Sequence, residues 1–249
     1  MALYQRLYGL YSVMERWIVP ELRHAQEHYH TTLRDLAAEG PRWLELGCGW
    51  HLLREWQEKE ERDLVATVPF LVGLEVDEGA LRKHRTIKDR VVGTASTLPF
   101  HDESFDIISA NMVVEHLDEP AVQFAEIRRA LRPGGVFVFH TPNLHGYIAT
   151  TARLLPEFVK GPLIQLLEKR TAQDVYPTFY RANTKEQVEE LAMQTGFDVV
   201  RISRVTSTAQ TAVVTPVAFF ELLWLRMLER WPRLEPFRTN LIVELRRAA

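Results

Sequence analysis

The sequence predicts an α/β protein with a doubly wound, mostly parallel sheet. The first observation is that short apolar runs typical of buried strands alternate with longer segments that favour helix. The second is that short turns join these segments, as in parallel βαβ units. The third is that no internal repeat, low-complexity tract or linker interrupts the 249 residues. We therefore expect a single domain over residues 1–249.

Residues 1–40 are expected to form a helical cap. Apolar residues of the first helix recur at spacings of three and four and so share one face: Tyr4, Leu7, Tyr8, Tyr11 and Met14. Pro20 interrupts this pattern, and a second helix is expected over about 21–38. Gly40-Pro41 then signals a stop, after which residues 41–146 form the predicted core.

The core and the segments after it contain the predicted sheet. Strands are expected at 43–46, 71–75, 90–93, 105–110 and 136–140, and near 198–206 and 239–246. Helices are expected at 51–62, 78–86, 119–131 and 184–195. Arg132-Pro133-Gly134-Gly135 is expected to end the helix before the fifth strand.

Two excursions, 147–183 and 207–238, break the alternation of strands and helices. Both exceed the roughly 2–6 residues of an ordinary αβ connection. Long excursions at strand ends of doubly wound sheets commonly shape ligand sites. We expect these two to serve the substrate or an oligomer contact.

Composition limits the classes of partner. The 30 basic and 33 acidic residues give a formal net charge of −3, so no overall field attracts nucleic acid, and none is expected as a partner. The single cysteine, Cys48, cannot form an internal disulfide, and the first residues show no apolar signal-type run. The expected location is therefore the cytoplasm, a reducing compartment.

A nucleotide-type site is predicted where the first two strands end. The first strand ends in Gly47-Cys48-Gly49 and the second in Glu75, and these carboxyl ends meet at one sheet edge. Glycines let a ligand approach the backbone, and a carboxylate can accept hydrogen bonds from ribose hydroxyls. The dinucleotide fingerprint needs a third glycine where Leu52 stands. S-adenosylmethionine, with ribose and adenine but no phosphate, does not need it.

The chain at this point resembles the class I S-adenosylmethionine-dependent methyltransferases, from about residue 42 to 145. Four ordered blocks carry the resemblance: Trp43–Gly49, Val72–Asp77, Leu98–Ile108, and Glu115–Leu117 followed by Glu126–Gly135. The resemblance implies a seven-stranded Rossmann-like methyltransferase sheet, an N-terminal helical lid over the cofactor pocket and a helical excursion before the last strand. It also implies S-adenosyl-L-methionine as the cofactor.

The resemblance implies roles for individual residues. Gly47 and Gly49 would pass close to the methionine and ribose parts of the cofactor, with backbone groups of Glu45 and Cys48 nearby, and Glu75 would hold the ribose hydroxyls. The positions expected to face the adenine or flank the cofactor are Thr94, Ala95, Asn111 and Met112. His51 and Thr94 depart from the family pattern, which usually has glycine and aspartate there. The Cys48 thiol is not expected to act as a nucleophile.

Methyl transfer to a hydroxyl calls for a base with a pKa near neutrality, which favours histidine. The candidates are His140, at the end of the fifth strand, and His116, after the fourth. Polar and aromatic side chains that suit a hydroxylated or anionic acceptor follow the fifth strand: Asn143, His145, Tyr176, Tyr180 and Arg181. No histidine pair has metal-ligand company, so no metal is expected.

The predicted helix at 217–231 is unusually apolar. Its broad apolar face is expected to comprise Val217, Phe220, Leu223, Trp224, Met227, Leu228 and Trp231. Two acids balance two arginines, so the sequence gives it no basic face for a membrane surface. Burial in the domain, a homodimer contact and contact with lipid all stay open, as do a monomer and a homodimer.

The leading hypothesis is S-adenosylmethionine-dependent methyl transfer to a small-molecule acceptor such as a sugar, glycolipid or other secondary metabolite. One alternative is a nicotinamide-dependent oxidoreductase on the same sheet, which Leu52 in place of the third glycine disfavours. Another is a catalytically silent cofactor-binding protein that interacts with partners through 217–231.

Overall fold

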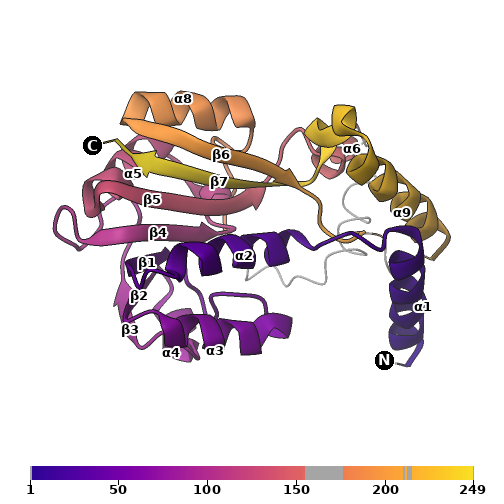
Figure 1. Ribbon diagram of the computed structural model, residues 1–249, viewed down its shortest axis with the longest axis horizontal. Coiled ribbons are helices and arrows are strands. Elements are labelled where there is room, and N and C mark those ends of the chain that lie inside the picture. The colour runs from indigo at the N-terminus through magenta and orange to yellow at the C-terminus, as the bar shows by residue number, and fades with distance from the viewer. Residues whose placement is uncertain (1, 155–175, 210, 212–214, 249) are drawn as a thin grey trace. The chain divides into compact units, whose positions relative to one another are not determined.

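The computed structural model describes residues 2–154, 176–209, 211 and 215–248 (Figure 1). The side chains of Tyr4, Leu7 and Tyr8 and residues 155–175 of the first excursion lie outside this description. The chain divides into two compact units. We call Met1–Ala25, Asn143–Tyr176 and Arg204–Asn240 the helical unit, and Gln26–Pro142, Pro177–Ser203 and Leu241–Ala249 the sheet unit. The single domain stays a prediction.

One seven-stranded sheet runs in the order β3-β2-β1-β4-β5-β7-β6. Its strands are β1 Arg42–Leu46, β2 Phe70–Glu75, β3 Asp89–Val92, β4 Phe105–Asn111, β5 Leu131–Pro142, β6 Phe197–Val205 and β7 Asn240–Arg247. The pairs β1–β2, β1–β4, β2–β3 and β4–β5 are parallel, and β7 runs against its neighbours (Figure 1). The predicted doubly wound, mostly parallel sheet is confirmed.

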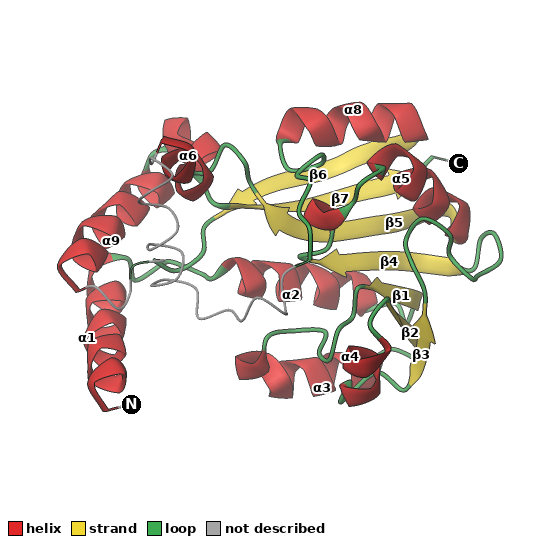
Figure 2. Cartoon of the chain, turned by 180° about the vertical axis from the view of Figure 1, so that it is seen from behind, coloured by secondary structure: helices red, strands yellow, loops and turns green. Residues whose placement is uncertain are grey.

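Helices lie on both faces of the sheet. They are α2 Ala25–Ala37, α3 Glu58–Thr67, α4 Glu78–Lys83, α5 Pro120–Ala130 and α8 Lys185–Thr195, with short 3₁₀ turns at Glu55–Gln57 and Val114–His116. From β1 the chain winds outward through β2 to β3, and from β4 it winds the opposite way to β5. Because such crossovers are right-handed, α3 and α4 lie on one face and α5 on the other, as Figures 1 and 2 show.

The core of the sheet unit is aromatic between α5 and the sheet. Phe124 of α5 is fully buried and meets the ring of Phe137 edge-on at 5.3 Å and that of Phe139 at 5.9 Å. Edge-to-face pairs at such distances are favourable beyond the area they bury. They fix α5 against β5 and thereby set where the carboxyl ends of β4 and β5 lie.

Local signals explain two helix starts. The side chain of Asp77 accepts hydrogen bonds from the N–H groups of Gly79 and Ala80 and so begins α4 directly after β2. Thr184 and Gln187 form a reciprocal capping box at the start of α8, which ends at Gly196 with φ +75°. The helix expected over 184–195 is confirmed.

Two expected boundaries are wrong. Residues 51–54 are not helical, because Leu52 and Leu53 are buried and the Leu53 N–H donates to the Glu61 carboxylate at 2.8 Å. Arg132–Gly135 do not simply close a helix. Leu131 already pairs with Phe105, and the ladder resumes at Val136 opposite Ile107, so these four residues form an irregularity inside β5.

The helical unit contains α1 Ala2–Ile18, α6 Tyr147–Leu154, α9 Thr215–Arg230 and a 3₁₀ segment Pro232–Phe237 (Figure 2). α1 packs on α9 around a core of its own, which includes Tyr11, Ala218, Leu222 and Leu225. No helix within the described ranges is long and apolar enough to cross a membrane.

The broad apolar face expected for α9 is mostly exposed. Of its seven residues only Leu228 is buried, and Val217, Phe220, Leu223 and Trp231 are exposed. Because the helix is apolar nearly all round, its pattern does not select a face. Glu221 selects it instead, through hydrogen bonds from Tyr147 Oη at 2.6 Å and the Thr211 N–H at 2.9 Å.

Candidate cofactor and acceptor site

Both glycines after β1 have left-handed backbones. Gly47 has φ +61°, and a Cβ there would lie 2.5 Å from Val113 Cγ2. Gly49 has φ +51°, and a Cβ there would meet no atom within 4 Å. Both positions favour glycine because of their left-handed backbones, and at Gly47 the packing against Val113 also leaves no room for a side chain. Gly49 borders open space. That open space is where a ligand can approach the backbone.

Glu75 ends β2 beside this turn and is held by backbone donors. One carboxylate oxygen accepts the Gly49 N–H at 2.9 Å, and the other accepts the N–H groups of Val76 at 2.8 Å and Asp77 at 3.0 Å. The side chain is 7% exposed. Three hydrogen bonds use most of the about four acceptor directions of a carboxylate. A diol that donates two hydrogen bonds must therefore displace one backbone donor. We expect it to displace the Gly49 N–H, because Gly49 borders open space.

Cys48 contributes its backbone and a small side chain. Its N–H donates to the Leu74 carbonyl at 3.1 Å, and its Sγ fills the space beside Gly73, where a Cβ would come within 2.7 Å. Burial raises the pKa of the thiol to about 12. A neutral, buried thiol is a poor nucleophile, in line with the expectation for this residue.

Thr94 and Ala95 follow β3 close to Glu75. The Gly93 N–H donates to the Glu75 carbonyl at 3.0 Å, and Thr94 is exposed while Ala95 is partly buried. His51, at the other departure from the family pattern, lines a cavity of about 340 Å³ together with Trp50, Leu53 and Lys83. His51 therefore occupies the α3–α4 side of the turn.

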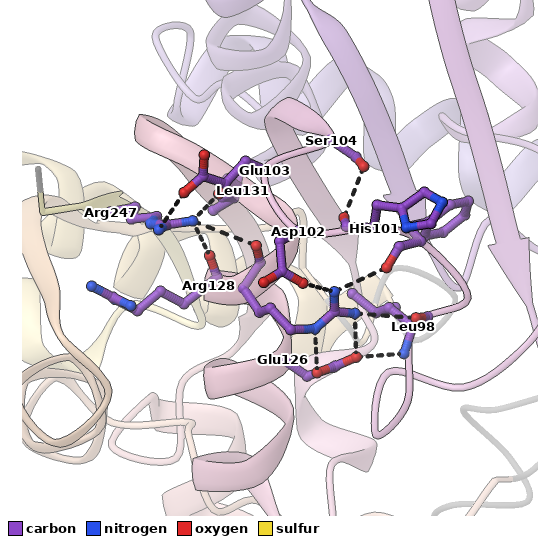
Figure 3. Close-up of polar contacts among 11 residues, drawn as sticks. Leu98, His101, Asp102, Glu103, Ser104, Glu126, Arg128, Leu131 and Arg247 are labelled. Carbon is purple, nitrogen blue, oxygen red and sulfur yellow. Dashed lines mark hydrogen bonds and ion pairs between the residues drawn. The ribbon is translucent and has the colours of Figure 1, made fainter.

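An arginine network anchors the segment that follows Thr94 and Ala95 (Figure 3). Arg129 of α5 donates to the Leu98 and Phe100 carbonyls at 3.2 and 2.9 Å and pairs with Glu126 and Asp102, both at 2.6 Å. The Leu98 N–H donates to Glu126 at 2.9 Å. A planar guanidinium with five donors can satisfy all these acceptors at once. The network fixes the chain that leads from the predicted adenine-facing residues to β4.

The predicted base His140 lies at the end of β5 in an amide network. Its Nδ1 is 3.0 Å from Asn111 Oδ1 and 3.3 Å from Gln26 Nε2. The amides of Gln26 and Asn111 pair reciprocally at 3.1 and 3.0 Å. His140 is 2% exposed, and the Tyr29 ring lies 5.7 Å away. Asn111 and His140 are therefore brought together, beneath residues of α2. Met112 follows with φ +59°, and its N–H donates to the His140 carbonyl.

Glu45 has a different place from the other cofactor candidates. Its carboxyl is buried in the sheet unit, where Ser109 donates to it and Trp43 Nε1 donates to Ser109 Oγ at 2.5 Å. Burial raises the pKa of Glu45 to about 8. The Glu45 side chain therefore binds Ser109 of β4.

The second histidine and two acceptor candidates belong to a loop held by Glu115. The Glu115 carbonyl accepts the N–H groups of Phe179 and Tyr180 at 2.8 and 3.1 Å. His116 Nδ1 is 2.8 Å from the Pro177 carbonyl, and Arg181 donates to the Asp118 carbonyl. Tyr180 is exposed with φ +53°. His116 and Arg181 therefore stabilise this loop, and they are not brought to His140.

The remaining acceptor candidates, Asn143, His145 and Tyr176, belong to the helical unit. The Asn143 amide donates to the Pro236 and Arg238 carbonyls at 3.0 and 2.7 Å, and its oxygen accepts the His145 N–H at 3.0 Å. Asn143 is buried, whereas His145 and Tyr176 are exposed. Asn143 thus serves the fold of its unit.

The sequence interpretation missed Gln26, Tyr29 and Ser109. Gln26 and Tyr29 stand on the buried stripe of α2 with Leu33. A glutamine on an otherwise apolar helical stripe is the signal that could have found Gln26, because buried polar groups need partners. Among the residues that the structure describes, no group of three or more His, Cys, Asp or Glu could hold a metal ion.

The residues present fit the implied cofactor. Gly49 borders open space, the Glu75 carboxylate stands beside it as an acceptor for a diol, and a polar amide network lies at the neighbouring strand ends. A carboxylate at this strand end suits the ribose diol of a nucleoside cofactor. The arrangement therefore fits the ribose of S-adenosyl-L-methionine.

Comparison with known proteins gives the same assignment. Residues 44–139 match the family described as "Methyltransferase domain". A probable S-adenosylmethionine-dependent methyltransferase of Mycolicibacterium smegmatis is 38% identical over 104 residues, which is 40% of this chain and 37% of that protein. The malonyl-[acyl-carrier protein] O-methyltransferase of Methylococcus capsulatus is 30% identical over 178 residues, or 68% of this chain and 56% of that one. The chain thus covers between about a third and just over half of these relatives.

The fold has solved counterparts as well. A SAM-dependent methyltransferase from Methanosarcina mazei superimposes with a TM-score of 0.56 at 14% identity, covering 87% of this chain and 97% of that one. At this identity the likeness concerns the fold. Residues 44–139 thus match the methyltransferase-domain family, and the fold is that of solved SAM-dependent methyltransferases.

Proposed function

We propose that this chain transfers a methyl group from S-adenosyl-L-methionine to an oxygen of a small-molecule acceptor. The observation that carries the cofactor half is the Glu75 carboxylate, fixed by the N–H groups of Gly49, Val76 and Asp77 beside the open face of Gly49. Names of relatives support the oxygen acceptor, since they include a fatty-acid O-methyltransferase and ubiquinone biosynthesis O-methyltransferases. Sugars, glycolipids and other secondary metabolites with a hydroxyl fall within this proposal.

The bound cofactor supplies an electrophilic methyl group on a sulfonium, so the protein has to align the acceptor and take its proton. Asn111 Oδ1 already accepts the Gln26 amide, and it lies 3.0 Å from His140 Nδ1. This arrangement favours the tautomer with the proton on Nδ1, which leaves the Nε2 lone pair to act as the base. His140 is 2% exposed, so an acceptor reaches its Nε2 only when the side chains packed around the ring move.

An oxidoreductase fits this chain less well. A dinucleotide pyrophosphate sits at the N-terminus of the helix that follows the glycine turn. Here α3 begins only at Glu58, and its first turn carries Glu58, Glu60 and Glu61. Leu52, at the third glycine position, is buried. Three carboxylates at that helix start would repel the phosphates of NAD.

Cofactor binding tests the first half of the proposal. Titration calorimetry should give S-adenosyl-L-methionine binding that Glu75→Ala weakens by roughly 10- to 100-fold, because hydrogen bonds to a charged group are worth about 1.5–3 kcal/mol. The matched control Glu78→Ala removes an exposed carboxylate of α4 and should bind as wild type does. Equal affinity for Glu75→Ala and wild type, or tighter binding of NADH than of the methyl donor, would contradict the assignment.

Transfer of tritiated methyl into lipid, glycan and small-molecule fractions of a cell extract tests the second half. His140→Asn should keep cofactor affinity within about twofold but lower the transfer rate by roughly 10²–10⁴, as expected for loss of a general base. His101→Asn removes an exposed histidine of the sheet unit and serves as the control. Cofactor binding without transfer to any fraction by the wild type would favour the catalytically silent alternative.

A further inference from the structure

We propose that the helical unit docks on an anionic membrane surface through the outer face of α9. By the outer face of α9 we mean Val217, Phe219, Phe220 and Leu223 with the flanking arginines Arg226 and Arg230. Phe220 is 69% exposed, and its ring stacks edge-on against that of Phe219 at 5.6 Å. A helix that is apolar all round is normally covered on every side. Within the described part of its own unit, the side with Ala218, Leu222, Leu225 and Leu228 is covered and the outer face is exposed.

The charges on α9 are divided between its two sides. Glu221 accepts from Tyr147 and Thr211, and Glu229 accepts from Thr206 at 2.7 Å and pairs with Arg238 at 3.3 Å. Arg226 and Arg230 are exposed, and neither forms an ion pair within the described part of the chain. Both acids therefore have partners inside the unit, whereas the two arginines are exposed beside the phenylalanines.

The helical unit as a whole also has more basic than acidic residues. By sequence count its three segments carry 12 basic and 8 acidic residues, a formal charge of +4, against 18 and 25, or −7, for the sheet unit. A negatively charged partner complements such a unit. A second copy of this chain does not, because a symmetric contact through the outer face of α9 would bring like charges together.

Lipid headgroups match this combination of residues. Aromatic side chains with nearby arginines are typical of segments that lie in the interface of a bilayer, with the rings at headgroup depth and the cations on anionic lipids. Trp17 of α1, at 86% exposed, and Trp231, at 50%, add two indoles to the exposed surface of the unit. The chemistry that recognises this face is therefore an anionic lipid surface, not a soluble anion.

Sedimentation with 100 nm vesicles tests the proposal without reference to methyl transfer. The full chain should bind vesicles of phosphatidylcholine with about 30% phosphatidylglycerol and bind pure phosphatidylcholine far less. The double variant Arg226→Gln/Arg230→Gln should bind about thirtyfold more weakly, at about fivefold per arginine. Phe220→Glu should bind about tenfold more weakly through loss of the apolar contact.

Matched controls show whether vesicle binding depends on the outer face of α9 or on the overall charge of the chain. Arg34→Gln/Arg82→Gln removes the same charge from the sheet unit, and Met193→Glu adds the same carboxylate at an exposed apolar position of α8. Both should bind as wild type does. Equal loss in the control variants would overturn the proposal, and so would a dimer in light scattering that Phe220→Glu abolishes while vesicles are not bound.

Discussion

The Glu45 carboxyl gives the sheet unit a stability that depends on pH. Burial raises its pKa to about 8 in the folded state, from an unfolded value near 4.5. A group whose pKa is raised on folding binds an extra proton in the folded state, so its contribution is full below about pH 4.5 and is lost as the pH rises through 8. Wild type should therefore lose a few kcal/mol of unfolding free energy between pH 5 and about 8.5.

The isosteric variant Glu45→Gln is permanently neutral and should remove this dependence. It should be less sensitive to pH in urea denaturation and more stable than wild type at about pH 8.5. The control Glu78→Gln neutralises an exposed carboxylate and should keep the wild-type slope. A slope in Glu45→Gln equal to that of wild type would show that Glu45 ionises normally in the folded protein.

Residues with a local signature were predictable from the sequence, and residues defined by tertiary partners were not. Glu75 was predictable because a strand end after an apolar run fixes its place next to the Gly47-Cys48-Gly49 turn. Gln26 was not, because its partners Asn111 and His140 lie 85 and 114 positions away. The contact of Arg181 was not predictable for the same reason, since the Asp118 carbonyl to which it donates is 63 positions away.

At the scale of elements, the two glycines of the turn after β1 have different roles: Gly47 packs against Val113, and Gly49 borders open space. Gly47→Ala places a methyl 2.5 Å from Val113 Cγ2 and should destabilise the fold by several kcal/mol. Gly49→Ala meets no atom within 4 Å and should cost only about 1 kcal/mol for its left-handed backbone, while its methyl enters the space beside Glu75. Gly49→Ala should therefore weaken cofactor binding with little change in the thermal unfolding midpoint. Gly47→Ala should lower the midpoint strongly and affect cofactor binding less. Similar losses of stability in both variants would contradict this division.

Element boundaries followed the apolar pattern only where it was unambiguous. The strands expected at 43–46 and 71–75 correspond to β1 and β2 within a residue. The start of α3 was placed too early because residues 51–62 are charged and favour helix, although the hydrogen bond from the Leu53 N–H to Glu61 belongs to a loop. The buried side of α9 could not be predicted because both sides of that helix are apolar, and the partners of Glu221 lie on the side that is buried.

At the scale of the whole molecule, the two units are interleaved along the chain. Their boundaries fall within strands, because Arg204 and Val205 of β6 and Asn240 of β7 belong to the helical unit while the other residues of both strands belong to the sheet unit. One part of a hydrogen-bonded strand does not readily unfold while the rest stays folded, because the broken pairs leave unpaired backbone groups. A single cooperative domain over residues 1–249 is thus the proposal, although each unit has its own core.

Ligand linkage tests this cooperativity. A ligand at about 100 times its Kd adds about 2.7 kcal/mol to whatever unfolds together with its site. S-adenosyl-L-methionine, bound at Gly49 and Glu75 in the sheet unit, should move the urea midpoint by about 1 M. Pulse-labelling hydrogen exchange along the titration reports amides of β1 and of α9 separately, and both sets should shift equally. A shift confined to β1, with the α9 transition unmoved, would mean that the helical unit unfolds on its own and that the chain has two domains.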